Sequence, residues 1–102
     1  VVYLIGELRG ISRQTETKTG SLMVRRVISI ARHWTDNEGR FHEDYDDFEL
    51  SSWGQVAEKI IEIQNGALVR VKGRVKVEKW NDSGETKSAV RIAAENVTIL
   101  CY

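Results

Sequence analysis

The sequence contains no proline, a single cysteine and no surplus of either charge, because fifteen Lys and Arg residues balance fifteen Asp and Glu residues. The lone cysteine, Cys101, excludes an internal disulfide and favours a reducing compartment. The sequence shows no secretory signal and no apolar run of membrane-spanning length. A neutral total also argues against a polycation that coats nucleic acid by charge alone, and it leaves room for charges sorted by segment.

Motifs of catalysis and metal binding are also missing. There is no nucleophile elbow and no glycine-rich phosphate loop. His33 and His42 have no Cys or His partner at zinc-ligand spacing, and the acidic residues from Glu43 to Glu49 lack the spacing of an EF-hand loop. We therefore predict no enzyme, no metal site and no cofactor.

The length and composition predict one domain over residues 1–102. A chain of 102 residues with 41% hydrophobic content can bury a single core. The sequence opens at Val1 without a methionine and stops just after a strand-like run. We expect it to be part of a longer protein whose tails lie outside these residues.

The segment Ala67–Trp80 is the most informative stretch, because apolar and basic residues alternate along it. Side chains of a strand point to opposite faces in turn, so one face would carry Val69, Val71, Val75 and Val77, and the other Arg70, Lys72, Arg74 and Lys76. Gly73 falls in the apolar set, which indicates a bend or a close backbone approach. The basic face is either an ordinary solvated face or a surface that follows phosphates and stacks a base near Trp80.

Four further strands and one helix surround this segment. The five strands are expected at about residues 1–8, 22–34, 41–52, 67–80 and 87–100. Residues 10–21 are polar and predict a turn-rich connection, while Asp36–Gly39 and Asn81–Gly84 carry strong turn chemistry. Ser52 and Gln55 have capping-box spacing at the start of a helix, and Asn65-Gly66 would end it.

The element order is three strands, one helix and two strands. Hairpin-linked strands with a single helix between the third and fourth are typical of an OB-type barrel. The sequence therefore predicts an all-β, five-stranded OB-fold barrel with one α-helix between strands 3 and 4. An unrelated α+β sandwich with the same order is the alternative.

The residues also resemble the bacterial and organellar single-stranded DNA-binding proteins along nearly the whole chain. Five pieces in the right order carry the resemblance: Val2–Leu8, Ile28–Trp34, Ser52–Glu58, Asn65–Val75 and Ala94–Leu100. The third has an aromatic, then Gly, then an Ala-Glu pair, and the fourth has the family's Gly-x-x-Val-x-Val-x-Gly pattern. The resemblance implies an OB fold that binds single-stranded DNA as a homo-oligomer, a tetramer or a dimer.

Carried over by position, all three tryptophans fall where the family stacks bases. An indole can stack on any base, so such binding needs no sequence preference. The expected DNA-binding residues are Trp34, Trp53, Trp80, Arg32, Arg70, Lys72, Arg74, Lys76 and Lys79. Of the tryptophans, Trp53 is the strongest candidate for a core residue instead, because it adjoins the start of the helix. His33 is expected on the surface near the nucleic acid.

The sequence departs from the family's pattern in the acidic third strand. Asp47 and Glu49 stand where the family usually has a tryptophan and a basic residue, and alternation places them on the face of Trp53. Two carboxylates there would repel phosphate, unless they pair with Arg25 and Arg26 of the neighbouring strand. Arg70 also replaces a frequent tyrosine, and the family's usual Asp-Pro pair is absent from the first connection.

Three functional hypotheses follow. The first is a nonenzymatic protein that coats and protects single-stranded DNA during replication, recombination or repair, in the cytoplasmic nucleoid or an organellar matrix. Its replication or repair partners would bind through tails outside this chain, and no membrane is involved. The second is an OB-fold protein-interaction subunit, resembling a primosome accessory protein, and the third is an RNA-binding OB domain.

Overall fold

The chain folds into one closed β-barrel with a single helix. The computed structural model describes residues 1–16 and 20–102, with the backbone alone for residues 11–16. Its elements are β1 Val2–Glu16, β2 Leu22–Thr35, β3 Phe41–Trp53, α1 Gly54–Glu62, β4 Leu68–Asp82 and β5 Glu85–Cys101. The predicted order of elements is confirmed, including the helix between β3 and β4.

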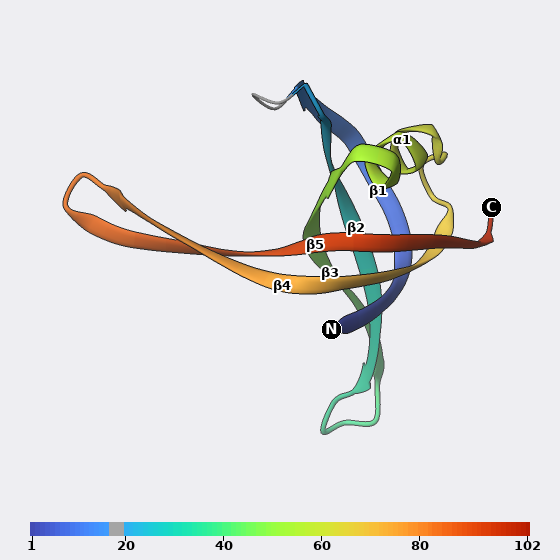
Figure 1. Cartoon of the computed structure of the whole chain (residues 1–102). Coiled ribbons are helices and arrows are strands. Elements are labelled where there is room, and N and C mark those ends of the chain that lie inside the picture. Colours follow the sequence, from blue (N-terminus) through green and yellow to red (C-terminus); the bar gives the residue numbers. More distant parts are fainter. Residues whose placement is uncertain (17–19) are drawn as a thin grey trace.

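The strands close in the order β1-β2-β3-β5-β4. All pairings are antiparallel except that of β3 with β5, which is parallel over three residue pairs. This is the five-stranded OB-fold barrel that the sequence predicts. Two hairpins extend beyond the barrel, one from β2 and β3 and one from β4 and β5, and α1 lies at the end opposite the β2–β3 tip (Figure 1). No helix in the described residues is long and apolar enough to span a bilayer.

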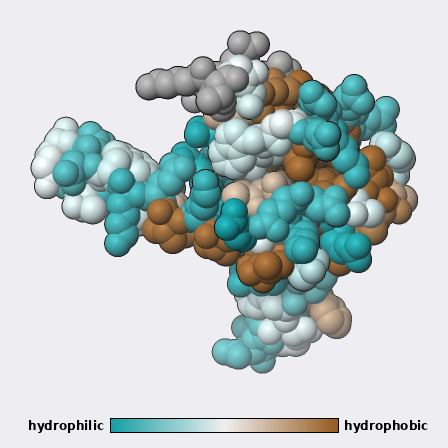
Figure 2. Space-filling model, viewed as in Figure 1, coloured by the Kyte–Doolittle hydropathy of each residue, from teal (hydrophilic) through white to brown (hydrophobic). Residues whose placement is uncertain are grey.

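The apolar set of β4 is buried only along the first half of the strand. Val69 and Val71 are completely buried in the core, whereas Val75 and Val77 are 52% and 57% exposed. The difference arises because β4 leaves the barrel with β5 as a projecting arm, residues 77–90, which begins just past the last β3–β5 pair (Figure 1). Apolar surface therefore remains where the arm meets the barrel (Figure 2).

Gly73 lies at this exit, where the predicted close approach is found. A Cβ added there would lie 2.5 Å from the carbonyl oxygen of Ala93. The register between β4 and β5 shifts between Lys72 and Gly73. Only a residue without a side chain fits such a contact, which lets the two strands bend out of the barrel together.

Two local predictions were wrong. The polar connection expected at residues 10–21 is strand as far as Glu16, because residues 13–16 pair with residues 22–25 of β2; residues 17–19 lie outside the described part. The expected capping box does not form either. Ser52 is buried and donates to the carbonyl oxygen of Val24 at 2.9 Å, so α1 starts after Trp53 without a side-chain cap.

Arg26 joins the helix to the barrel. It is only 4% exposed, and its guanidinium donates to the carbonyl oxygens of Ile60 at 2.7 Å and Ile63 at 2.6 Å. It also donates to Oδ1 of Asn65 at 2.6 Å and to the carbonyl oxygen of Gly10 at 3.2 Å. Burial lowers the pKa of Arg26. The carbonyl end of a helix carries partial negative charge, so the cation is favourably placed.

Candidate nucleic-acid interface

One outward face runs continuously across β3, β5 and β4. Glu49 of β3 lies beside Arg91 of β5, and Arg91 lies beside Lys76 of β4. Trp53 ends β3 on this face, and Nζ of Lys76 lies 4.9 Å from the centre of its ring. Trp80 shares the alternation of Lys76, since the register between β4 and β5 is regular from Gly73 to Asp82. The structure therefore places Lys76 against Trp53, and Trp80 lies four residues farther along β4 on the same side of the strand.

All three tryptophans are partly exposed. Their exposed fractions are 42% for Trp34, 40% for Trp53 and 45% for Trp80. The alternative that Trp53 is a core residue is therefore wrong. It closes β3 with its ring outward, while Ser52 points into the barrel. A half-exposed indole is accessible to a planar partner, which is what base stacking requires.

Trp34 lies apart from the other two. It pairs with His42 at the tip of the β2–β3 hairpin, whereas Trp53 pairs with Met23 near the base, and the register between these strands has no shift. Because alternation continues between them, the two tryptophans lie on opposite faces of the β2–β3 ladder. The family pattern could not reveal this, because the faces of residues on two different strands are related by the register between those strands.

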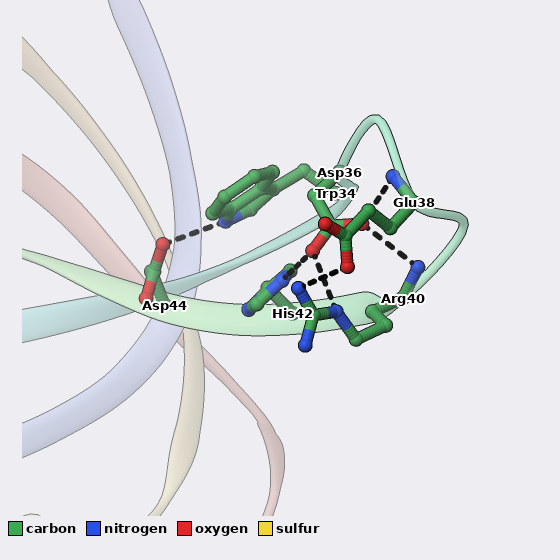
Figure 3. Close-up of polar contacts among 6 residues, drawn as sticks. All are labelled: Trp34, Asp36, Glu38, Arg40, His42 and Asp44. Atoms are coloured by element: carbon green, nitrogen blue, oxygen red, sulfur yellow. Dashed lines mark hydrogen bonds and ion pairs between the residues drawn. The ribbon is translucent and has the colours of Figure 1, made fainter.

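Polar contacts fix the ring of Trp34 (Figure 3). It stacks on the imidazole of His42, with ring centroids 4.4 Å apart and an interplanar angle of 17°. Its Nε1 donates to Oδ2 of Asp44 at 2.6 Å. His42 in turn contacts Asp36, with 2.7 Å between Nε2 and Oδ2. One face of the indole is thus covered by His42, and a base can stack only on the other.

Asp36 organises the turn beneath this stack (Figure 3). Its Oδ1 accepts hydrogen bonds from the backbone N–H groups of Glu38 and Arg40, both at 2.9 Å. The hydrogen bond from His42 and these backbone contacts lower the pKa of Asp36. The strong turn chemistry of residues 36–39 is thereby confirmed, and it doubles as the support of Trp34.

The predicted basic residues divide into different surroundings. Arg70 and Lys72 line a depression of about 210 Å³ together with Tyr3, Asn96 and Thr98. Arg74 pairs with Glu95 at 2.9 Å, and Arg32 pairs with Asp44 at 3.5 Å. Lys79 alternates with Trp80 and so projects to the opposite face of the arm. Of the basic set on β4, Lys76 is the residue that contacts a tryptophan.

The two unexpected carboxylates are not free. Oε1 of Glu49 lies 3.6 Å from Nε of Arg25 and 3.4 Å from Nε of Arg91. Asp47 accepts a hydrogen bond from Oγ of Ser29 at 2.5 Å. Pairing with Arg25 is thus confirmed for Glu49, while pairing with Arg26 is wrong because Arg26 is buried against α1.

Sequence reasoning missed Arg91. It lies 42 positions from Glu49 in the chain, and the two meet only because β3 and β5 pair in parallel. One signal was available: Arg91 is the lone charge between Ser88 and Glu95 in an otherwise apolar run, at an outward position between Ala89 and Ala93. A guanidinium in such a place is often held by a carboxylate from a neighbouring strand.

Comparison with known proteins decides the family. The family model described as "Single-strand binding protein family" matches residues 1–100. The chain belongs to this family. A single-stranded DNA-binding protein of Aquifex aeolicus is 34% identical over 100 residues, which cover 97% of this chain and 68% of that protein. A single-stranded DNA-binding protein of Treponema pallidum is 28% identical, covering 97% of this chain and 56% of the relative.

Solved structures agree with the family assignment. The single-stranded DNA-binding protein of Thermus aquaticus, as a deletion mutant, superposes with a TM-score of 0.80 at 27% identity, over 96% of this chain and 48% of that one. The Plasmodium falciparum SSB complex with ssDNA superposes with a TM-score of 0.85 at 17% identity, over 97% and 92% of the two chains, and supports the fold alone. The chain thus spans about half of the Thermus protein and about two thirds of the Aquifex relative.

Proposed function

We propose that this chain is a nonenzymatic module that binds single-stranded DNA and protects it during replication, recombination or repair, in the nucleoid or an organellar matrix. The observation that carries the proposal is the outward face that presents Trp53 in contact with Lys76 and, farther along β4, Trp80. Membership of the single-strand binding protein family supports it, as do the relatives named for this activity.

Binding on this face would combine stacking with charge. Bases stack on the exposed indoles, each contributing about 1–3 kcal/mol regardless of sequence. Lys76 covers Trp53 in the free protein, so a base that takes its place releases the ammonium toward a phosphate. Trp34 offers one face of its ring at the tip of the β2–β3 hairpin. Single-stranded DNA that contacts both Trp53 and Trp34 must therefore pass around the β2–β3 ladder.

Quenching of tryptophan emission by a dT oligonucleotide tests the proposal. We expect strong quenching at low salt, and Trp80→Ala and Trp34→Ala should each weaken binding by about 1–3 kcal/mol. Tyr102→Ala is the matched control, since Tyr102 is an exposed aromatic residue at the end of the chain. Absence of quenching by the wild-type protein would overturn the proposal. Parallel titrations with an rU oligonucleotide distinguish a preference for RNA.

We also propose that the chain forms a homo-oligomer through β1. In the described residues, β1 pairs with β4 along Val2–Glu7 but with β2 only from Glu7 onward, so one edge of the first residues has no partner strand. Tyr3 and Ile5 are exposed beside this edge. An open strand edge flanked by apolar side chains is suited to pairing with a second copy.

Sedimentation analysis tests the oligomer. The wild-type chain should sediment as a dimer or tetramer, and Ile5→Lys should shift it toward the monomer because association would bury an unpaired cation. Val90→Lys, an equally exposed substitution on the arm, should leave the size unchanged. A monomeric wild-type chain, or equal effects of both substitutions, would contradict an interface at β1.

One observation favours the alternative of a protein-interaction subunit. A depression of about 330 Å³ over β1, β2 and β3 is lined by apolar Ile5 and Leu68 and bordered by Glu7 and Glu43. Such a surface suits a basic partner protein. The oligonucleotide titration separates the two functions, because an interaction subunit would bind DNA weakly or not at all.

A further inference from the structure

The most unusual arrangement on the outward face is a carboxylate shared by two guanidinium groups. The same oxygen, Oε1 of Glu49, faces Nε of Arg25 at 3.6 Å and Nε of Arg91 at 3.4 Å. Both nitrogen atoms are buried and neither has a hydrogen-bond partner in the described part of the chain. The single carboxylate therefore faces two positive charges, and the hydrogen bonds of the two arginines remain incomplete.

This cluster belongs to the stacking face. Arg25 pairs across β2 and β3 with Ser51, two residues before Trp53, and Arg91 pairs across β4 and β5 with Lys76. Arg91 also contacts Glu78 through its Nη1. Three cations and two carboxylates thus meet beside Trp53, and the side chains of Arg25 and Glu49 are about a third exposed. If a base of single-stranded DNA stacks on Trp53, the sugar-phosphate backbone of that DNA would pass this cluster.

We propose that Arg25 and Arg91 form a phosphate-binding position for the bound strand, and that Glu49 is the resident anion of that position in the free protein. This inference rests on the proposed function. A phosphate suits two guanidinium groups as a carboxylate does, and it offers more acceptor oxygens. It can complete the hydrogen bonds that Glu49 leaves unmade, provided that the Glu49 side chain turns toward solvent.

A similar replacement is expected at the ring of Trp53. In the free protein Lys76 covers Trp53 and Glu49 occupies the arginines; in the complex a base and a phosphate replace them. The protein therefore binds DNA against an internal competitor. The consequence is a weaker affinity and a smaller salt dependence than the number of basic side chains on this face would produce.

Glu49→Gln tests whether the Glu49 carboxylate competes with DNA phosphate, because this substitution keeps the shape of the side chain and removes its charge. We expect dT oligonucleotide binding to tighten roughly two- to fivefold at low salt, and the salt slope to steepen by up to about 0.7, the value for one phosphate. Glu58→Gln is the matched control, because Glu58 is exposed on α1 and its loss changes the net charge equally. Thermal unfolding of each variant verifies that it folds.

The arginines provide a second, independent measurement. Arg25→Gln and Arg91→Gln should each weaken binding and reduce the salt slope, and in either background the gain from Glu49→Gln should disappear. The proposal is overturned if Glu49→Gln binds no tighter than Glu58→Gln, or if the gain persists without the arginines. Those outcomes leave the proposed function intact when wild-type quenching is present, whereas an unquenched wild-type protein refutes both.

Discussion

His42 and Asp36 determine what Trp34 can do. The imidazole covers one face of the indole, Asp44 holds its N–H, and Asp36 holds the imidazole. A ring held by two such contacts, one of them itself supported by Asp36, loses little rotational freedom when a base stacks on it. A preformed stacking surface of this kind lowers the entropic cost of binding.

The lowered pKa of Asp36 predicts how the tip responds to acid. Because its folded pKa lies below the ordinary value of 3.8, the charged carboxylate stabilises the folded tip above that value, and this contribution is lost as the pH falls through the folded pKa. The melting temperatures of wild type and Asp36→Asn should therefore differ by a constant amount near neutral pH. The difference should shrink in strongly acidic solution. Asp46→Asn, at an exposed carboxylate of β3, serves as control. A pH-independent difference would contradict the assignment.

Helix α1 depends on Arg26 more than on its own ends. The helix has no side-chain cap at its start, and at its far end the guanidinium satisfies the carbonyl oxygens of Ile60 and Ile63. Its inward residues, Ala57 and Ile60, are completely buried. The helix is therefore anchored at its C-terminal end by a side chain from β2.

Arg26→Met should lower the free energy of unfolding by about 2–4 kcal/mol, since it removes the guanidinium donors of the Ile63 carbonyl oxygen and of Asn65 Oδ1, whereas the Ile60 carbonyl oxygen keeps the N–H of Ile63. Arg26→Lys should cost less, because an ammonium can restore part of these bonds. Urea unfolding followed by tryptophan emission measures both, with Lys59→Met on the helix as a comparison. An unchanged midpoint for Arg26→Met would show that water replaces the guanidinium without loss.

The elements of this chain could be predicted because their patterns are local. Three local patterns predicted the correct elements. They are the alternation in residues 67–80, the turn residues at 36–39 and 81–84, and the helical spacing of the apolar residues between β3 and β4. The prediction was wrong where the structure depends on a partner strand. Residues 13–16 are polar and were expected in a turn-rich connection, but they form a strand because β2 pairs with them. Ser52 does not cap α1, because its side chain points into the barrel from β3 and donates to the carbonyl oxygen of Val24.

The candidate site was less predictable than the barrel. Partial exposure of the three tryptophans agrees with the expected stacking role, but the separation of Trp34 from the others depends on the face of a ladder. The pairing of Glu49 with Arg91 depends on closure of the barrel. No spacing within the sequence encodes either relation, because both arise from residues brought together by strands far apart in the chain.

At the scale of the whole molecule, closure of the barrel relies on its shortest contact. The parallel pairing of β3 with β5 spans only three residue pairs, and Glu49 and Arg91 form one of them. Local opening begins where the fewest backbone bonds resist it, so this seam is where the barrel would first part. Single-stranded DNA bound across this β3–β5 pairing would stabilise it, because a ligand that binds only the closed form stabilises that form. DNA would then act as a structural component of its own binding protein, and the barrel would be most durable when it is occupied.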